Sequence, residues 1–193
     1  LLGRLQRLLG LLPVLAAGNI LVSDRSTGLY IVRPSGAAFT NYGQGCACSA
    51  NQPCPSLNAN GGTLSNSTGG GALTPSLGNA GLPILNSSYT VTLDGSIPAT
   101  LAVMVSGLSD SIYTGSPLPV ALPGSPGCSV YAAPQVLDLH ITNAAGTADA
   151  SFNIPGSPGL IGIEVFHQWA VWDPTINSLG IVMSDAGRAT IDT

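Results

Sequence analysis

The sequence predicts an all-β protein: an antiparallel β-sandwich, jelly-roll or immunoglobulin-like, preceded by an apolar N-terminal arm and a β-hairpin. Three observations lead to this class. From about residue 81 onward, eight or nine short segments with strand-like apolar patterns follow one another at regular spacing. Turns rich in Pro and Gly separate these segments, and none of them shows a convincing helical period. With 193 residues, the chain is long enough to bury one core and to carry extensions.

The composition divides the chain into four parts. We expect an apolar arm at residues 1–18, a hairpin at residues 19–40, a disulfide-pinned loop at residues 41–80 and the sandwich at residues 81–193. Gly, Ser, Asn and Pro dominate the loop, and no periodicity survives there, which is typical of a linker.

The arm is rich in leucine. Its leucines fall at alternating four- and three-residue spacing, which would place them on one helical stripe: Leu1, Leu5, Leu8, Leu12 and Leu15. Gly3, Gly10 and Pro13 argue against a robust helix. The same stretch can be interpreted as a signal peptide with Ala16 at its cleavage site, and it is too short and broken to cross a membrane.

The hairpin follows the arm. Apolar runs at residues 20–23 and 29–32 flank the turn-rich stretch "DRSTG", as in two antiparallel strands joined by a short loop. The segment "GNILVSDRSTGLYIVRPSG" resembles one blade of an NHL-like β-propeller, in which a Gly-Asn turn leads into an apolar strand that ends in Ser-Asp. Only one such unit is present, and a single blade has no neighbour to cover its faces.

The sandwich strands are expected in short segments. In order, they are residues 88–95, 99–107, 118–122, 128–131, 135–142, 147–155, 160–172, 181–184 and 188–191. Apolar and polar residues alternate in several of them, which is typical of strands buried on one face. Asn66 and Asn86 match glycosylation acceptor tripeptides and mark surface positions.

Four cysteines, Cys46, Cys48, Cys54 and Cys128, decide the expected compartment. Their spacing fits no zinc site, no redox Cys-x-x-Cys and no haem attachment signature. An even number of cysteines in a charge-poor chain therefore predicts two disulfides and an oxidising, extracellular environment. Three pairings are possible. A Cys46–Cys48 bridge would close a strained ring, so we rank that pairing last. We favour Cys46–Cys128 with Cys48–Cys54, while the pairing within the 46/48/54 cluster stays open.

From Tyr42 onward, the chain resembles the C-terminal β-sandwich domain of large secreted bacterial surface proteins. The resemblance covers about 150 residues and rests on seven pieces in the same order: "YGQGC", "LPILNSSYTVTLDG", "GSPLPVAL", "PGCSVY", "NIPGSPGLIG", "HQWAVWDP" and "NSLGIVMS". It implies the sandwich architecture, a pairing of Cys46 with Cys128 and a non-catalytic cell-surface module. It brings no catalytic residue and no cofactor.

Charge is scarce and unevenly placed. Charged residues make up 7% of the chain, lysine is absent, and so there is little self-repulsion between copies. Residues 1–33 carry a net charge of +3 and residues 34–193 a net charge of −7, so contact between the arm and an acidic body has a favourable sign. No basic patch suits a nucleic acid.

No catalytic constellation stands out. The nucleophile-elbow motif G-x-S-x-G is absent, the acids are far apart in sequence, and His140 and His167 show no ligand spacing. We therefore expect no enzyme activity, metal or cofactor. Trp169 and Trp172 are candidates for stacking on sugar rings, but they are three residues apart on a strand and so face opposite sides, which puts at least one in the core.

These observations favour an extracellular structural subunit that self-assembles head-to-tail into a filament or surface layer. The arm and hairpin would pack on a neighbouring copy because the hairpin lacks sister blades. The expected assembly residues are Leu5, Leu8, Leu12, Ile20, Val22, Leu29 and Ile31. The alternative is a carbohydrate-binding or adhesive cell-surface module that holds surface glycans through the tryptophans. Nothing specific supports a hydrolase.

Overall fold

The computed structural model describes residues 20–24, 28–32, 36–46, 74–174 and 176–193. The chain divides into two compact units, Leu1–Gly36 and Ala37–Thr193. No helix in the described ranges is long and apolar enough to cross a membrane.

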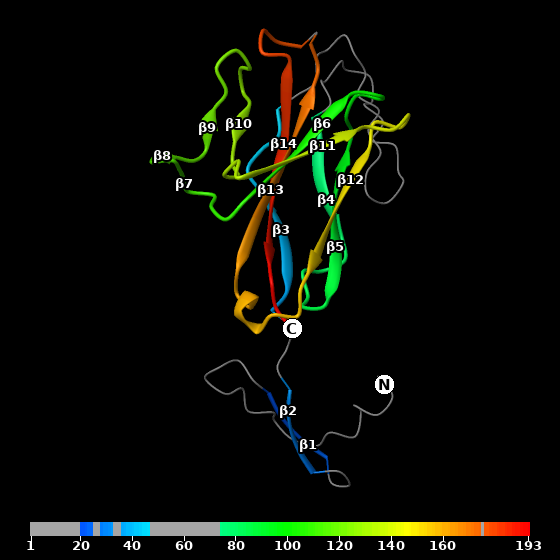
Figure 1. Ribbon diagram of the computed structural model, residues 1–193, viewed down its shortest axis with the longest axis vertical. Coiled ribbons are helices and arrows are strands. Elements are labelled where there is room, and N and C mark those ends of the chain that lie inside the picture. Colours follow the sequence, from blue (N-terminus) through cyan, green and yellow to red (C-terminus); the bar gives the residue numbers. More distant parts are fainter. Residues whose placement is uncertain (1–19, 25–27, 33–35, 47–73, 175) are drawn as a thin grey trace, which may run out of the picture. The chain divides into compact units, whose positions relative to one another are not determined.

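The first unit contains the predicted hairpin. Strand β1 (Ile20–Asp24) pairs antiparallel with β2 (Gly28–Val32), with Ile20 opposite Val32. The two strands form a two-stranded sheet of their own and pair with no other strand that the structure describes (Figure 1). The predicted hairpin is confirmed, and the arm at residues 1–18 lies outside the described residues.

The second unit is an antiparallel β-sandwich, as predicted. A five-stranded sheet with the order β11-β6-β13-β14-β3 packs against a three-stranded sheet with the order β12-β5-β4 (Figure 1). The eight strands are β3 (Ala38–Tyr42), β4 (Ser76–Ala80), β5 (Ser87–Asp94), β6 (Leu101–Gly107), β11 (Val136–Ile141), β12 (Ala148–Ile154), β13 (Glu164–Trp172) and β14 (Ile181–Thr190).

Alternating side chains of both sheets form the core. On β5 the predicted apolar face, Tyr89, Val91 and Leu93, is buried. Met104 and Trp169 meet this face from the five-stranded sheet, and both are fully buried. The Trp169 ring N–H donates to the carbonyl of Thr92 at 3.1 Å, so the largest side chain in the core bridges the two layers.

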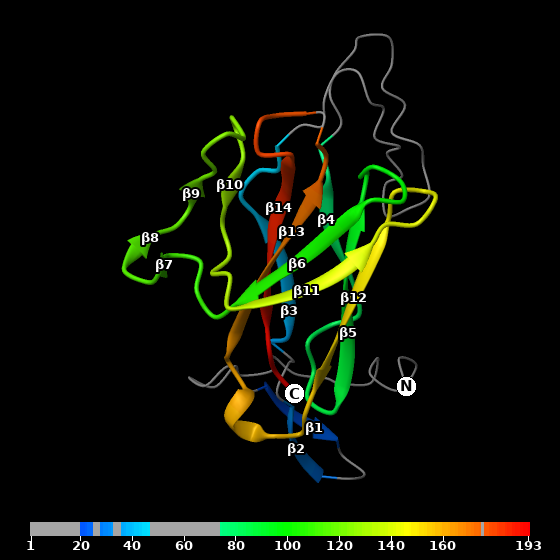
Figure 2. The same ribbon diagram turned by 45° about the horizontal axis from the view of Figure 1, so that its top comes forward.

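One corner of the sandwich is a folded ribbon. The segment from β5 to β6 and the segment from β11 to β12 run antiparallel beside each other from one sheet to the other. β12 pairs with β5 in the three-stranded sheet, and β11 pairs with β6 in the five-stranded sheet (Figure 2). At the corner the Ser96 N–H donates to the Gly146 carbonyl at 3.1 Å, and the Thr142 hydroxyl donates to the Ile97 carbonyl at 2.6 Å. This path leaves β11 at the edge of the five-stranded sheet.

An extension between β6 and β11 carries two short hairpins. They are formed by β7 (Ile112–Tyr113) with β8 (Ser116–Pro117), and by β9 (Val120–Ala121) with β10 (Ser129–Val130). The Cys46–Cys128 disulfide ties this extension to the segment after β3, which confirms that predicted pairing. Cys48 and Cys54 lie outside the described residues.

Two strands correct the predicted domain boundaries. We expected β3 to belong largely to the hairpin region and β4 to the loop at residues 41–80, yet both are edge strands of the sandwich. The sequence "SLGNA" of β4 shows no alternation because Leu77 is its one buried side chain. Its position depends instead on a distant group, since the Asp185 carboxylate accepts the Leu77 N–H at 2.7 Å.

Smaller differences concern strand ends. The two strands expected at residues 181–184 and 188–191 are one continuous strand, β14, of ten residues. Its pairing with β13 contains a β-bulge, where the register shifts between Gln168 and Ala170. The expected strand at residues 160–172 starts only at Glu164, because a 3₁₀ turn, Pro158–Leu160, precedes it.

Candidate functional site

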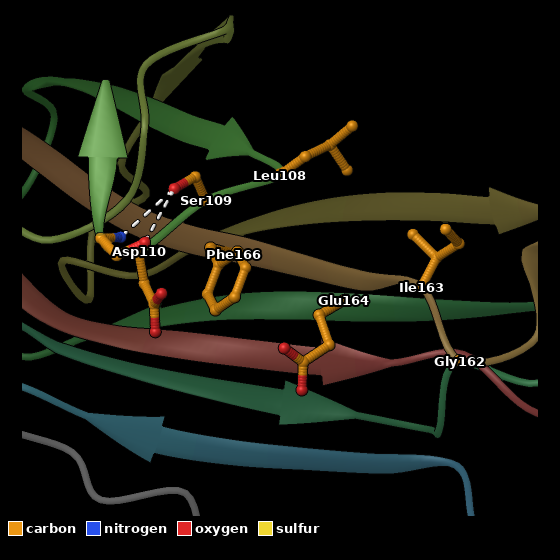
Figure 3. A pocket seen from close by; sticks show the side chains of 8 residues that line it. Leu108, Ser109, Asp110, Gly162, Ile163, Glu164 and Phe166 are labelled. Carbon is orange, nitrogen blue, oxygen red and sulfur yellow. Dashed lines mark hydrogen bonds between the residues drawn. The ribbon is translucent and has the colours of Figure 1, made fainter. Parts of the chain in front are cut away.

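A surface pocket of about 360 Å³ lies beside the extension. Residues after β6 and at the start of β13 line it (Figure 3): Leu108, Ser109, Asp110, Ser111, Gly162, Ile163, Glu164 and Phe166. The Ser109 hydroxyl accepts the backbone N–H groups of Ser111 at 3.2 Å and Ile112 at 3.1 Å. These two hydrogen bonds hold the turn that presents Asp110 to the pocket.

The charges around this pocket come from three elements. Arg188 on β14 donates to the Glu164 carboxylate at 3.5 Å, and its guanidinium lies 6.0 Å from the ring centres of Tyr42 and Phe166. Burial, and then the nearby Asp110 carboxylate, raise the pKa of the Tyr42 phenol, and Arg188 partly offsets them. The Arg188–Glu164 pair is about 40% exposed, with 39% and 41% of the two side chains accessible, so we expect it to contribute less than about 1 kcal/mol.

Two carboxylates beside an open pocket invite comparison with a glycosidase site. Here, however, Glu164 is engaged by Arg188, and no histidine, cysteine or serine nucleophile aligned with a base lines the pocket. Across the described part of the chain, no group of three or more His, Cys, Asp or Glu side chains could hold a metal ion. The carboxylates and serine hydroxyls of the lining can accept hydrogen bonds from a polar ligand.

A Ser–His pair lies elsewhere, inside the core. His167 on β13 is hydrogen-bonded through Nδ1 to the Ser106 hydroxyl at 2.9 Å and through Nε2 to the Tyr89 hydroxyl at 2.8 Å. All three side chains are buried, and burial lowers the pKa of His167 to about 4. A substrate cannot reach this serine, so the array joins the two sheets as a satisfied polar network rather than acting as a catalytic pair.

The other predicted aromatic and histidine positions divide between core and surface. Trp169 is buried and therefore cannot stack on a sugar, whereas Trp172 is 46% exposed, which confirms that the two rings face opposite sides. His140 pairs with the Asp138 carboxylate at 3.0 Å and packs edge-on against Trp169. Asn86 is exposed, in keeping with a surface marker, and Asn66 is outside the described residues.

The expected assembly residues fall in the first unit. Ile20 and Val22 lie on β1, and Leu29 and Ile31 lie on β2, as the sequence indicated. The arm residues Leu5, Leu8 and Leu12 are not among the residues that the structure describes.

Sequence reasoning missed an apolar surface on β11. We call it the β11 patch and define it as Leu101 of β6 with Leu137, Leu139 and Ile141 of β11, which are 41%, 63%, 64% and 73% exposed. An alternating strand such as residues 135–142 is normally buried on its apolar face. The available signal was that neither face of this segment is wholly polar, because leucines alternate with Val136, Asp138 and His140.

Comparisons with known proteins add no relative: no family model matches this chain, and no curated protein or solved structure is significantly similar to it.

Proposed function

We propose that this chain is a non-catalytic, extracellular structural subunit that self-assembles head-to-tail into a filament or surface layer through its N-terminal arm and hairpin. The observation that carries the proposal is the hairpin, whose two strands pair with no other described strand. An isolated two-stranded hairpin is at best marginally stable in water. The N–H and C=O groups at its outer edges can pair with a sheet of a neighbouring copy. Because this contact joins two different surfaces, each copy can bind a further copy, and the assembly grows as an open filament.

Composition and covalent structure support the same function. The Cys46–Cys128 disulfide is compatible with an oxidising, extracellular location. From residue 34 onward Arg188 is the one arginine or lysine, so residues 34–193 carry a net negative charge and residues 1–33 a net positive charge. The pocket without bond-breaking groups and the inaccessible Ser106–His167 pair favour a structural role over an enzymatic one.

Deletion of residues 1–36 tests the proposal. The boundary follows the division between the two units, and the remaining unit keeps its own core and disulfide. We expect the full chain to form filaments or sheets in negative-stain images at high concentration, and the shortened chain to remain dispersed. The point variant Ile31→Asp should also reduce assembly, whereas the control Ala144→Asp adds the same charge to an exposed turn of the sandwich and should not.

Two results would contradict this function. One is assembly of the shortened chain to the same extent as the full chain, and the other is a full chain that stays dispersed at every concentration. A dispersed full chain whose binding to glycans is lost in Trp172→Ala would instead favour the second candidate, an adhesive module. The exposed Trp172 ring is the one observation that supports that alternative.

A further inference from the structure

We propose that β11 is a second assembly contact, independent of the arm and hairpin: its free edge pairs antiparallel with β11 of a second copy, about a two-fold axis through Leu139. The two five-stranded sheets would then join into one continuous sheet. The contact is between identical surfaces, so it closes as a dimer, in contrast to the head-to-tail contact of the hairpin.

The free edge of β11 has a defined set of backbone groups. β11 is the last strand of its sheet and pairs with β6, with His140 opposite Ala102. The Thr142 N–H donates to the Thr100 carbonyl at 2.9 Å in the same register. In an antiparallel pair, residues with N–H and C=O turned to the partner alternate. Even-numbered residues of β11 therefore face β6, and the backbone groups of Leu137, Leu139 and Ile141 point to the open edge.

This edge lacks most of the usual protection against pairing. Edge strands are commonly blunted by lysine, proline, a bulge or inward charges. β11 has none of the first three, since its register with β6 runs without a shift over all six residues. β12, the corresponding edge of the other sheet, shows the contrast, because its outward face is polar and consists of Asp149, Ser151 and Asn153. The apolar β11 patch thus occupies an edge that would ordinarily be polar.

The sequence of β11 is complementary to itself. With the axis at Leu139, each Leu137 lies opposite Ile141 of the second copy, and the two Leu139 residues lie opposite each other. On the other face, each Asp138 carboxylate lies opposite the His140 imidazole of the second copy, so a hydrogen-bond acceptor and a hydrogen-bond donor meet twice. Asp138 is well placed for this contact, because 64% of its side chain is exposed even though it already pairs with its own His140. Cross-strand aliphatic pairs and hydrogen-bonded polar pairs are favourable.

Other registers fit less well. Odd-numbered residues must lie opposite odd-numbered residues, so the axis passes through a residue and not between two. An axis at Asp138 would place the two Asp138 carboxylates opposite each other, and an axis at His140 would place the two His140 rings opposite each other, so both lose the Asp138–His140 pairs. An axis at Leu137 would place Leu139 opposite Gln135, beyond the start of the strand, and an axis at Ile141 would place Leu139 opposite Asn143, beyond its end. The axis at Leu139 keeps Leu137, Leu139 and Ile141 paired with one another and sets no two Asp138 carboxylates opposite each other. Because six residues per copy make a small interface, we expect a weak dimer with a dissociation constant on the order of 100 µM.

Cysteine cross-linking in the full chain tests the register directly. Opposed Cα atoms in a hydrogen-bonded antiparallel pair are about 5.5 Å apart, within reach of a disulfide. We expect Leu139→Cys to form a disulfide-linked dimer under mild oxidation, seen on a non-reducing gel. In the matched control Leu137→Cys, the two thiols would lie four residues apart along the sheet, about 14 Å, and should not cross-link. Peptide mapping should show Cys46–Cys128 intact in both variants.

The outcomes separate this contact from the proposed function. Leu139→Cys should still cross-link after residues 1–36 are deleted, and Leu139→Lys should abolish dimers in sedimentation velocity while filaments still form. Equal cross-linking at positions 137 and 139, or no cross-linking at 139 with protein in the 100 µM range, would overturn the β11 contact alone. If the full chain forms no filaments but Leu139→Cys still cross-links into a dimer, the proposed role of the hairpin would be overturned and the β11 contact would stand.

Discussion

At the scale of single residues, the imidazole of His167 connects the stability of the sandwich to pH. The ring is buried and hydrogen-bonded to Ser106 and Tyr89, and burial lowers its pKa to about 4, from 6.5 in the unfolded chain. Between these two values the unfolded state binds the extra proton. The stabilisation from the neutral ring is therefore complete above about pH 6.5 and is lost progressively as the pH falls toward 4.

We predict that the free energy of unfolding falls by about 3 kcal/mol between pH 7 and pH 4 through this group. His167→Gln should flatten that dependence, and His140→Gln, at a partly exposed site, should preserve it. Urea unfolding followed by tryptophan fluorescence at several pH values measures the difference. Burial and the Asp149 carboxylate raise the pKa of Asp94, so this group makes the folded state less stable as the pH rises, opposite to His167. The difference in pH dependence between wild type and variant therefore isolates the contribution of His167. Identical pH profiles for wild type and His167→Gln would refute this account.

At the scale of elements, Asp185 on β14 fastens two short edge strands. Its carboxylate accepts the Leu77 N–H of β4 at 2.7 Å and the Asn41 side-chain amide of β3 at 2.9 Å. The Asn41 amide also donates to the Leu77 carbonyl at 2.5 Å. β3 and β4 belong to different sheets, so this one carboxylate closes the side of the sandwich opposite the folded ribbon.

Asp185→Ala should destabilise the sandwich by about 2 kcal/mol, since it leaves the Leu77 amide without its charged acceptor. Hydrogen exchange should show the Leu77 amide losing protection first. The control Asp149→Ala removes a carboxylate from the exposed face of β12 and should have little effect on either measurement. Unchanged protection of Leu77 in Asp185→Ala would show that β4 is held by its pairing with β5 alone.

At the scale of the whole molecule, the Cys46–Cys128 disulfide joins parts of the chain that are 82 residues apart. Both cysteines are buried against the core, and the Met183 N–H donates to the Cys46 sulfur at 2.9 Å. The bridge therefore joins the extension between β6 and β11 to the segment after β3, and the hydrogen bond from Met183 joins both to β14.

Removal of the bridge by Cys46→Ser with Cys128→Ser should lower the free energy of unfolding by about 2–4 kcal/mol, chiefly because a long loop in the unfolded chain is no longer closed. The urea midpoint of the variant measures the loss. Replacing Cys48 and Cys54 by serine leaves the Cys46–Cys128 bridge in place and serves as the control. A midpoint equal to that of the wild type in the Cys46 and Cys128 variant would contradict the prediction.

Local pattern was enough to predict much of this molecule. The alternation of Tyr89, Val91 and Leu93 predicted a half-buried strand, because side chains of a strand alternate between faces whatever lies beyond them. The turn between two apolar runs predicted the hairpin. The even number of cysteines predicted two disulfides, and the strain of a Cys46–Cys48 ring left two pairings. The resemblance to a secreted surface domain supported the one that contains Cys46–Cys128.

Only the tertiary structure decided which faces are covered. β4 pairs with β5, and the carboxylate of Asp185, more than a hundred residues away in the chain, accepts its Leu77 amide. The apolar residues of β11 are exposed because they lie on the face of the sheet that is turned away from the buried Ala102 and Met104. The Ser106–His167–Tyr89 array forms because three strands from both sheets meet in the core. The periodicity of a segment predicts which of its side chains share a face. Whether that face is covered depends on other segments, which come from distant parts of the chain.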